Sequence, residues 1–358
     1  MTSIEDIQIA VYAPESISDR CDIFPMWDVA ESEWLSARGK GVGGSDLSSI
    51  VGVNKYKSAL QLWAEKTGTI PAEKIDNEAI RLGNRFEKPV AEEYADRFGF
   101  ALVEWPVSLR LRSHPYMLAN LDFLRVTPSE KFPAGVVTTH HSVIPPEDIQ
   151  SIVEVKTTGL SGFGTAHQWG AEDEETMPIG YELQCRHYLL VAGQSEAELV
   201  GLLGGRGLQV RHVSRDVDYE EYIIDLESRF WAHVVAGTPI EPDGSESADE
   251  TLKALYPRGD EEIEMEGGSK LDNLWHDFGD AKKRFTEVET EKKELRAKIV
   301  ALVGSAAYAT VHGQRILSFK NSQDSDWFNE KKFAVENPAI YAKYVSKKPG
   351  FRTLRAAK

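Results

Sequence analysis

The segment SIVEVKTT, residues 151–158, sets the strongest constraint on how this chain folds. It predicts a strand, and because strand side chains alternate between two faces, Glu154 and Lys156 share one face. Burying a carboxylate and an ammonium near the centre of a strand is costly unless a metal ion, a partner or water compensates them. The segment is therefore either an edge strand with a surface ion pair or a strand that carries a functional site.

Helical and strand-like patterns alternate around this segment and predict an α/β fold. An amphipathic helix is indicated by an apolar residue at every fourth position: Leu82, Phe86, Val90, Tyr94 and Phe98. Gly99 can end this helix, and Glu87 lies beside its apolar stripe. A strand (YMLANLDFLRV, 116–126) precedes SIVEVKTT, and a helix (GYELQCRHYLLVAG, 180–193) follows it. The expected architecture is a mixed sheet flanked by helices.

A second carboxylate, Asp122, lies between Leu121 and Phe123 in the neighbouring strand-like run. Two carboxylates on adjacent strands repel each other, and a divalent cation that prefers oxygen ligands holds such a pair ionised. Mg²⁺ or Mn²⁺ suits this pair, and a lysine beside a metal-bound water favours its deprotonated form. Asp122, Glu154 and Lys156 together therefore suit phosphodiester hydrolysis.

Composition sets the class of protein and the compartment. With 41% hydrophobic residues among 358, a substantial core is expected, and no apolar run reaches the roughly 20 residues needed to cross a membrane. We expect a cytoplasmic protein without a membrane partner, because the start lacks a signal sequence. The only two cysteines, Cys21 and Cys185, form no metal-binding motif.

The net charge of −16 argues against a nucleic-acid partner until its distribution is considered. Residues 1–33 carry a net charge of −7 and residues 241–266 a net charge of −8, so the rest of the chain is close to neutral. The last sixteen residues, 343–358, contain six basic residues and no acidic one. This tail is either simply solvated or lies along a phosphate backbone.

We expect four regions along the chain. These are an acidic segment (1–25), an α/β domain (26–237), an acidic linker (238–266) and a helical and hairpin C-terminal region with the basic tail (267–358). An irregular stretch inside the domain, residues 127–148, is expected to be a surface insertion.

The C-terminal region begins with a heptad pattern whose single apolar seam predicts one long helix. The seam either pairs with another subunit or packs against its own chain, which is our default expectation. YATVHGQRILSFKN then predicts a hairpin that turns at His312 and Gly313, followed by a short helix. The residues of the seam are Leu271, Leu274, Phe278, Ala281, Phe285, Val288, Lys292, Leu295, Ile299 and Leu302.

The ordered set of these residues resembles the PD-(D/E)XK (restriction-endonuclease-like) nucleases. It comprises Glu87 on a helix, Asp122 on one strand, the Glu154–Lys156 triplet on the next, and Gln184 and Tyr188 on the following helix. More narrowly, it is similar to the YqaJ-type viral recombinases, relatives of the phage lambda exonuclease. The stretch WLSARGKGVGGSDLSSIVG resembles that family's opening, and SKKPGFRTLR resembles its closing segment. The resemblance covers about residues 34–200.

The resemblance implies a role for each residue. Asp122, Glu154, the carbonyl of Val155 and Glu87 would hold two Mg²⁺ or Mn²⁺ ions, and Lys156 would position the attacking water. Gln184 and Tyr188 match a QxxxY pattern and would line the DNA channel. From spacing alone, Glu87 is an ordinary surface carboxylate paired with Lys88 or Arg85. Spacing leaves Gln184 and Tyr188 open: they either line the channel, or Tyr188 packs and Gln184 hydrogen-bonds a neighbour.

Arg38 and Ser45 could hold a terminal 5′-phosphate, because the turn Gly43-Gly44-Ser45-Asp46 leads into a helix whose free N–H groups favour an anion. Ser45 or Asp46 could equally be a plain helix cap.

The family resemblance further implies a Mg²⁺-dependent exonuclease that resects linear double-stranded DNA from 5′ to 3′. Its 3′ single strands would pass to a single-strand annealing protein in phage-type homologous recombination, and a ring-shaped homotrimer is implied. The alternatives are a PD-(D/E)XK endonuclease and a non-catalytic DNA-binding or assembly module. Phe123 departs from the family, which often has glycine after the metal-binding Asp. His140 and His141 are expected to be solvated.

Overall fold

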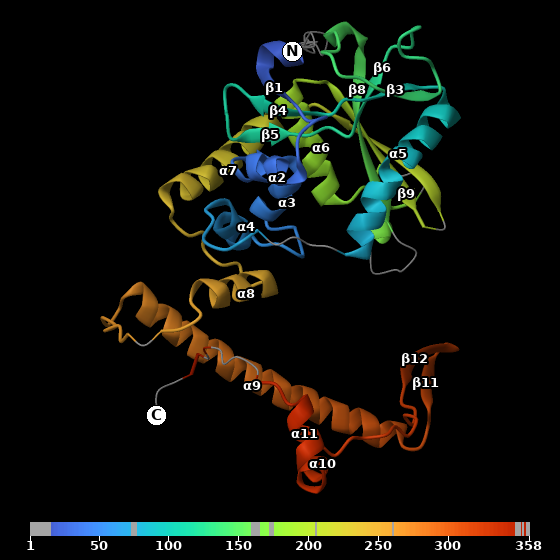
Figure 1. Ribbon diagram of the computed structural model, residues 1–358. Coiled ribbons are helices and arrows are strands. Elements are labelled where there is room, and N and C mark those ends of the chain that lie inside the picture. Colours follow the sequence, from blue (N-terminus) through green and yellow to red (C-terminus); the bar gives the residue numbers. More distant parts are fainter. Residues whose placement is uncertain are drawn as a thin grey trace, which may run out of the picture. The chain divides into compact units, whose positions relative to one another are not determined.

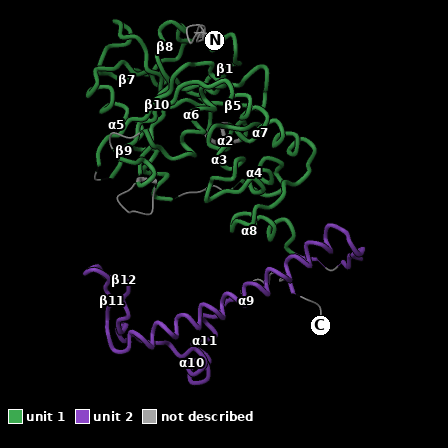
Figure 2. The backbone as a smooth tube through the Cα atoms, turned by 180° about the vertical axis from the view of Figure 1, so that it is seen from behind, with its two compact units in different colours: residues 1–257 green, residues 258–358 purple. Residues whose placement is uncertain are grey.

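The computed structural model describes residues 16–72, 77–158, 165–171, 175–204, 206–259, 261–347, 352, 354 and 355. The chain divides into two compact units, residues 1–257 and residues 258–358 (Figure 2). Most of the predicted acidic segment and much of the basic tail lie outside the described residues.

A mixed six-stranded sheet forms the centre of unit 1, as the sequence predicted (Figure 1). The spatial order is β10-β9-β8-β6-β3-β7; β8 pairs antiparallel with β6 and parallel with β9. β8 is therefore an interior strand. The strands are β3 Ala101–Glu104, β6 Phe123–Val126, β7 Val136–Thr139, β8 Ile149–Thr158, β9 Glu196–Leu203 and β10 Gly207–Ser214.

A second sheet of four strands, which the sequence did not predict, lies in the same unit in the order β1-β4-β5-β2. It includes residues assigned from sequence to the acidic segment, because β1 pairs with β4 and Cys21 is buried. Its strands are β1 Cys21–Pro25, β2 Val42–Gly43, β4 Val107–Leu111 and β5 Met117–Ala119.

Two long helices cover opposite faces of the six-stranded sheet (Figure 1). Val153 and Val155 of β8 pack with α5 Glu78–Phe98, whereas Ile152 packs with α6 Ile179–Ala192. Both helices end at a glycine with positive φ, Gly99 and Gly193, as predicted. The buried stripe of α5 is narrower than expected, because Val90 and Tyr94 are buried while Phe86 and Phe98 are exposed.

The remaining helices of unit 1 surround the smaller sheet. A separate apolar cluster joins Leu60 and Trp63 of α4 to Phe230 of α7 and Ala248 of α8. The predicted acidic linker, 238–266, thus contains a helix that packs in unit 1. These helices are α1 Ile17–Arg20, α2 Glu31–Gly39, α3 Gly44–Ile50, α4 Ala59–Lys66, α7 Val217–Ala236 and α8 Glu246–Leu255, with 3₁₀ turns at Pro146–Asp148 and Thr165–Trp169.

Two predicted segments are organised differently from the expectation. The insertion 127–148 is not wholly irregular, because the β-branched run Val136–Thr139 forms edge strand β7 beside β3. The run 116–126 is not one strand: it forms β5 in the smaller sheet and β6 in the larger one. The chain changes sheets at residues 120–122, which places Asp122 on a bend.

Unit 2 contains the predicted long helix, α9 Lys270–Val303, and the predicted hairpin. The hairpin joins β11 Tyr308–Val311 to β12 Gln314–Ser318, and its turn residues His312 and Gly313 have φ of 48° and 81°. Two short helices follow, α10 Glu330–Glu336 and α11 Pro338–Tyr344. In the described part of the chain, no helix is long and apolar enough to cross a membrane.

Candidate active site

Glu154 and Lys156 lie on one face of the interior strand β8, which excludes the edge-strand interpretation. The side chain of Glu154 is 1% exposed and that of Lys156 is 23% exposed. The ammonium of Lys156 donates a hydrogen bond to Oε1 of Glu154, so the two charges compensate each other inside the fold.

Asp122 approaches this pair from the bend that precedes β6. Its Oδ2 accepts a hydrogen bond from the backbone N–H of Val155 at 3.0 Å. Because that amide belongs to the residue between Glu154 and Lys156, the contact fixes Asp122 beside both charged groups. The sequence predicted this proximity, although it placed Asp122 within a strand rather than at a change of sheet.

Among Glu87, Asp122 and Glu154, Glu154 is the most deeply buried carboxylate. Its Oε1 also accepts a hydrogen bond from Nε2 of Gln184 at 2.6 Å. Within the described residues, its Oε2 is buried and has no hydrogen-bond partner. Burial and repulsion from Asp122 raise the pKa of Glu154 to about 8, although Lys156 opposes both effects. This oxygen is available to a ligand that supplies positive charge.

Lys156 remains protonated in this environment. Burial alone would lower the pKa of its ammonium, but the carboxylates of Glu154 and Asp122 outweigh burial and raise that pKa. The ammonium also lies 5.6 Å from the ring centroid of Tyr181 on α6, a cation–π distance.

Glu87 extends the acidic cluster from helix α5. Lys88, a partner suggested by spacing alone, pairs instead with Glu104 at 2.7 Å. Burial and repulsion from Asp122 raise the pKa of Glu87 to about 7. Glu87 is half-buried and lies close enough to Asp122 for the two carboxylates to repel each other.

Gln184 and Tyr188 share one face of α6, as their spacing predicts. Nε2 of Gln184 donates to the Tyr188 hydroxyl at 3.0 Å, and both side chains are buried. Gly44 of α3 lies against them, because a Cβ added there would be 2.8 Å from Cε1 of Tyr188 and 3.0 Å from Cγ of Gln184. Gln184 thus contacts Glu154, and both residues lie against α3. Their role in lining a DNA channel stays a prediction.

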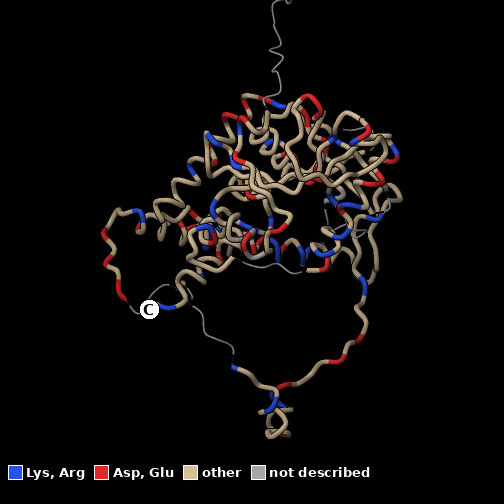
Figure 3. The backbone as a smooth tube through the Cα atoms, turned by 45° about the horizontal axis from the view of Figure 1, so that its top comes forward, with Lys and Arg blue, Asp and Glu red and all other residues tan. Residues whose placement is uncertain are grey.

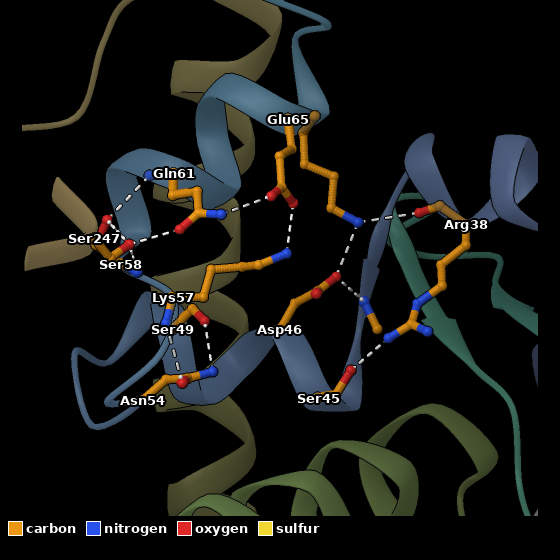
Figure 4. Close-up of polar contacts among 12 residues, drawn as sticks. Arg38, Ser45, Asp46, Ser49, Asn54, Lys57, Ser58, Gln61, Glu65 and Ser247 are labelled. Carbon is orange, nitrogen blue, oxygen red and sulfur yellow. Dashed lines mark hydrogen bonds and ion pairs between the residues drawn. The ribbon is translucent and has the colours of Figure 1, made fainter. Parts of the chain in front are cut away.

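Arg38 and Ser45 meet at the start of α3, where Nη2 of Arg38 donates to Oγ of Ser45 at 2.6 Å (Figure 4). The cap of α3 is Gly43, whose N–H donates to the Asp46 carboxylate at 3.1 Å. Ser45 is therefore not the helix cap. Asp46 is the residue that serves a capping role.

The sequence did not identify Lys66 of α4, which lies with Arg38 beside the carboxylate of Asp46. Its ammonium lies 2.9 Å from Oδ2 of Asp46 and donates to the carbonyl of Arg38 at 3.1 Å. Burial alone would raise the pKa of Asp46, but Lys66 and Arg38 hold it below its usual value. The contact depends on the tertiary packing of α4, so no local sequence pattern could have identified it.

A cavity of about 450 Å³ adjoins both groups of residues, since Ser45 and Gln184 both line it. Tyr56 also lines it and is 81% exposed, which is unusual for an aromatic side chain. The Asn54 side chain accepts hydrogen bonds from the backbone of Tyr56 and Lys57, at 2.9 and 3.2 Å, and so fixes the loop that presents Tyr56. This exposed aromatic was also missed from the sequence.

The donor set around Glu154 suits a hard divalent cation, which prefers carboxylate and carbonyl oxygens. The unpartnered Oε2 of Glu154 and the raised pKa values of Glu154 and Glu87 fit such an ion. Among the described residues, no three His, Cys, Asp or Glu side chains converge closely enough to surround an ion as they stand. His140 and His141 do not join this group: His141 is exposed and stacks on Trp27 with ring centroids 4.8 Å apart. The expectation that both are solvated is wrong for His140, whose ring packs edge-on against Phe132 with a buried Nε2.

Acidic and basic positions are interspersed through both units rather than separated into broad faces (Figure 3). Any contact with a polyanion must therefore depend on local groups such as Arg38 and Lys66, not on a general positive field.

Comparison with known proteins identifies the family. Residues 33–195 match the YqaJ-like viral recombinase domain. The uncharacterized protein YqaJ of Bacillus subtilis (strain 168) is 30% identical over 328 residues, covering 91% of this chain and 93% of that protein. The chain therefore belongs to the YqaJ-like viral recombinase family.

Solved structures show only a distant likeness. An alkaline exonuclease from Laribacter hongkongensis aligns with a TM-score of 0.44 and 16% identity, over 58% of this chain and 94% of that one. A phage-related exonuclease from Haemophilus somnus aligns with a TM-score of 0.37 and 15% identity, over 55% of this chain and 96% of that one.

Proposed function

We propose that unit 1 is a Mg²⁺-dependent deoxyribonuclease and that Asp122, Glu154 and Lys156 form its catalytic centre. The observation that carries the proposal is the fully buried Glu154, whose Oε2 has no hydrogen-bond partner among the described residues. An unsatisfied buried carboxylate oxygen is costly, and Glu227, which pairs with His187, has one as well. At Glu154 the oxygen supports a metal site because Asp122 and Lys156 lie beside the same residue.

Two Mg²⁺ or Mn²⁺ ions held by Asp122, Glu154, Glu87 and the Val155 carbonyl would supply an activated water and neutralise charge on the phosphoryl group. Lys156 holds its proton and orients the attacking water beside Glu154. Gln184 positions Glu154 by donating to its Oε1 at 2.6 Å. The Val155 N–H holds Asp122 at 3.0 Å. These contacts preorganise the charged groups before substrate arrives.

Arg38 and Ser45 are proposed to hold the terminal 5′-phosphate of a linear duplex. Arg38 supplies a charge-assisted donor, and Lys66 neutralises the adjacent Asp46 carboxylate, which would otherwise repel an anion. Ser45 and Gln184 line one cavity, and Gln184 contacts Glu154 of the catalytic centre, which supports a path from a strand end held at Ser45 toward that centre. Tyr56 on the rim is placed to stack on a base.

A grip on the 5′ end makes the enzyme a 5′-to-3′ exonuclease that leaves a 3′ single strand. The family's association with viral recombination agrees with this product, which a single-strand annealing protein would use in the host-cell cytoplasm. A ring-shaped homotrimer around the duplex remains a proposal based on the family resemblance.

The test follows release of label from linear duplex DNA labelled at either the 5′ or the 3′ end, with Mg²⁺ or with EDTA. A covalently closed circle is the matched control. We expect Mg²⁺-dependent release that begins at the 5′ end and spares the circle.

Cleavage of the circle would replace the exonuclease with a PD-(D/E)XK endonuclease. DNA binding without cleavage of any substrate would instead support a non-catalytic DNA-binding module.

A further inference from the structure

A histidine and a glutamate are paired in the interior of unit 1, apart from the residues assigned to the catalytic centre. His187 of α6 and Glu227 of α7 are both 0% exposed, and Nδ1 of His187 lies 2.7 Å from Oε1 of Glu227. Burying two ionisable groups is costly, and an apolar pair of similar size is often at least as stable. The pair is therefore better explained by what it holds in place than by a gain in stability.

The second ring nitrogen of His187 shows what the pair holds. Nε2 lies 2.8 Å from the backbone carbonyl oxygen of Leu118 in β5. A carbonyl oxygen only accepts hydrogen bonds, so Nε2 must carry a hydrogen. Nδ1 then either donates to an ionised Glu227 or accepts from a protonated one, and in both cases one proton lies between the two side chains. Glu227 thus orients the ring, and the ring donates to Leu118.

Both members of the pair favour keeping this proton. Burial alone would lower the pKa of the His187 ring, but Glu227 outweighs burial and raises that pKa. Burial raises the pKa of the Glu227 carboxyl, and His187 opposes this effect only in part. The contact with Leu118 is therefore maintained near neutral pH.

Leu118 lies where the smaller sheet ends and the chain turns toward the larger one. Its register partner is Gly43, the last residue of the two-residue strand β2, so pairing with β2 stops at this position. Asp122 follows four residues later, on the bend at residues 120–122. A side-chain donor at the Leu118 carbonyl therefore holds the strand from which Asp122 emerges.

The same helix holds the other carboxylate of the centre. Gln184 precedes His187 by three residues on α6 and donates to Oε1 of Glu154 at 2.6 Å. α6 is therefore bonded through Gln184 to the larger sheet and through His187 to the smaller one. Because Asp122 lies on the connection between these sheets, the two contacts on α6 fix Asp122 relative to Glu154.

We propose that His187, oriented by Glu227, is a positioning residue for the metal site, which holds Asp122 in place beside Glu154 through the carbonyl of Leu118. The inference rests on the proposed function, because it takes Asp122 and Glu154 to be metal ligands. His187 and Glu227 act only through β5 and touch neither the metal ion nor DNA.

A double replacement separates positioning from stability. His187→Phe with Glu227→Leu removes both polar groups and leaves no unpaired buried carboxylate, so most of the metal-free stability to urea should be retained. The Leu118 carbonyl loses its donor. We expect the Mg²⁺ concentrations for half-maximal thermal stabilisation and for half-maximal single-turnover cleavage of linear duplex to rise roughly 10- to 100-fold. DNA affinity in EDTA should not change.

Two single replacements of Glu227 give a second test that keeps the histidine. Glu227→Gln can still donate from its amide to Nδ1 and orient the ring, whereas Glu227→Leu cannot. We expect a Mg²⁺ requirement within about threefold of wild type for Glu227→Gln and roughly tenfold higher for Glu227→Leu.

Tyr94→Phe is the matched control, because it removes a buried hydrogen bond of 2.6 Å, to Glu198, that does not involve β5. It should lower stability without changing the Mg²⁺ requirement. An equal rise in this control would show that lost stability alone explains the effect, and would overturn the inference.

A wild-type Mg²⁺ requirement in the double variant, or equal requirements in Glu227→Gln and Glu227→Leu, would overturn the inference and leave the nuclease proposal intact. A wild-type protein that is neither stabilised by Mg²⁺ nor able to cleave DNA would instead overturn the proposed function, and the inference with it.

Discussion

The two units of this protein differ in which side chains they bury and which they expose. Unit 1 buries ionisable groups: Glu154 and the hydrogen-bonded pair of His187 with Glu227 are inside the fold, with their partners at hydrogen-bond distance. Unit 2 exposes apolar surface, since no residue of α9 is buried. The buried groups of unit 1 are held in place by hydrogen bonds, which indicates a preorganised site, whereas the described residues of unit 2 leave the apolar seam of α9 exposed.

The largest expected difference between the units is in cleavage rate, when one lysine in each unit is replaced by alanine. Lys156→Ala should lower cleavage of linear duplex by roughly a thousandfold, because it removes the group that orients the attacking water. Lys292→Ala in α9 should leave the rate constant for cleavage unchanged. Single-turnover rates with saturating enzyme measure both, and equal losses in the two variants would remove the distinction between the units.

Replacing Arg38 should reduce the cleavage rate by a smaller factor, and only for one kind of DNA end. Arg38→Ala is expected to slow degradation of 5′-phosphorylated duplex by roughly 10- to 100-fold, the value of a charge-assisted contact, and to spare 5′-hydroxyl ends. Parallel assays on the two substrates measure the ratio. An equal loss on both would mean that Arg38 supports the fold rather than the phosphate.

Replacing one glycine in each unit by alanine tests how tightly the backbone is packed there. Gly44→Ala should lower the free energy of unfolding by about 1–3 kcal/mol, because the added Cβ would collide with Tyr188 and Gln184. Gly279→Ala in α9 has nothing within 4 Å and should stabilise the helix by about 0.5–1 kcal/mol. Urea unfolding checks both values, and destabilisation by Gly279→Ala would show that α9 is packed on that face.

The pH dependence of stability should originate in unit 1. A carboxylate with a raised folded-state pKa contributes stability that is complete below its unfolded pKa and is lost as pH rises through the folded pKa. With pKa values of about 7 for Glu87 and about 8 for Glu154, the metal-free protein should become less stable between about pH 5 and pH 8.

Mg²⁺ should offset this loss, because it binds the deprotonated carboxylates. Thermal unfolding with and without Mg²⁺ should therefore show a larger stabilisation near about pH 8.5 than near about pH 6. Glu154→Gln should flatten the metal-free profile. If the stability of metal-free Glu154→Gln changed with pH as the wild type does, other groups would be responsible for the pH dependence.

Local periodicity was sufficient to predict the elements around the site. The alternation in SIVEVKTT placed Glu154 and Lys156 on one face, and the heptad and the His312-Gly313 turn predicted α9 and its hairpin. Sequence could not show that residues 116–126 divide between two sheets, because strand pairing is decided by contacts distant in the chain. For the same reason it missed the smaller sheet and α8.

The sequence predicted that Asp122, Glu154 and Lys156 lie together, but it did not predict their contacts with other segments. The bonds from Gln184 to Glu154 and from Lys66 to Asp46 join segments 30 and 20 residues apart, and only the packing of α6 and α4 creates them. For Glu87, sequence spacing suggested a surface ion pair with Lys88. Its electrostatic repulsion from Asp122 depends on how α5 packs on the sheet, which spacing does not show.

The central claim is that the buried carboxylate of Glu154 is needed for chemistry rather than for folding. Glu154→Gln preserves size and removes only the charge, so the fold and the contact with Gln184 should be kept. Single-turnover cleavage of 5′-phosphorylated linear duplex in Mg²⁺, measured together with DNA affinity, tests it most directly. The account predicts unchanged affinity with no detectable cleavage. Cleavage within a few-fold of the wild-type rate would contradict it.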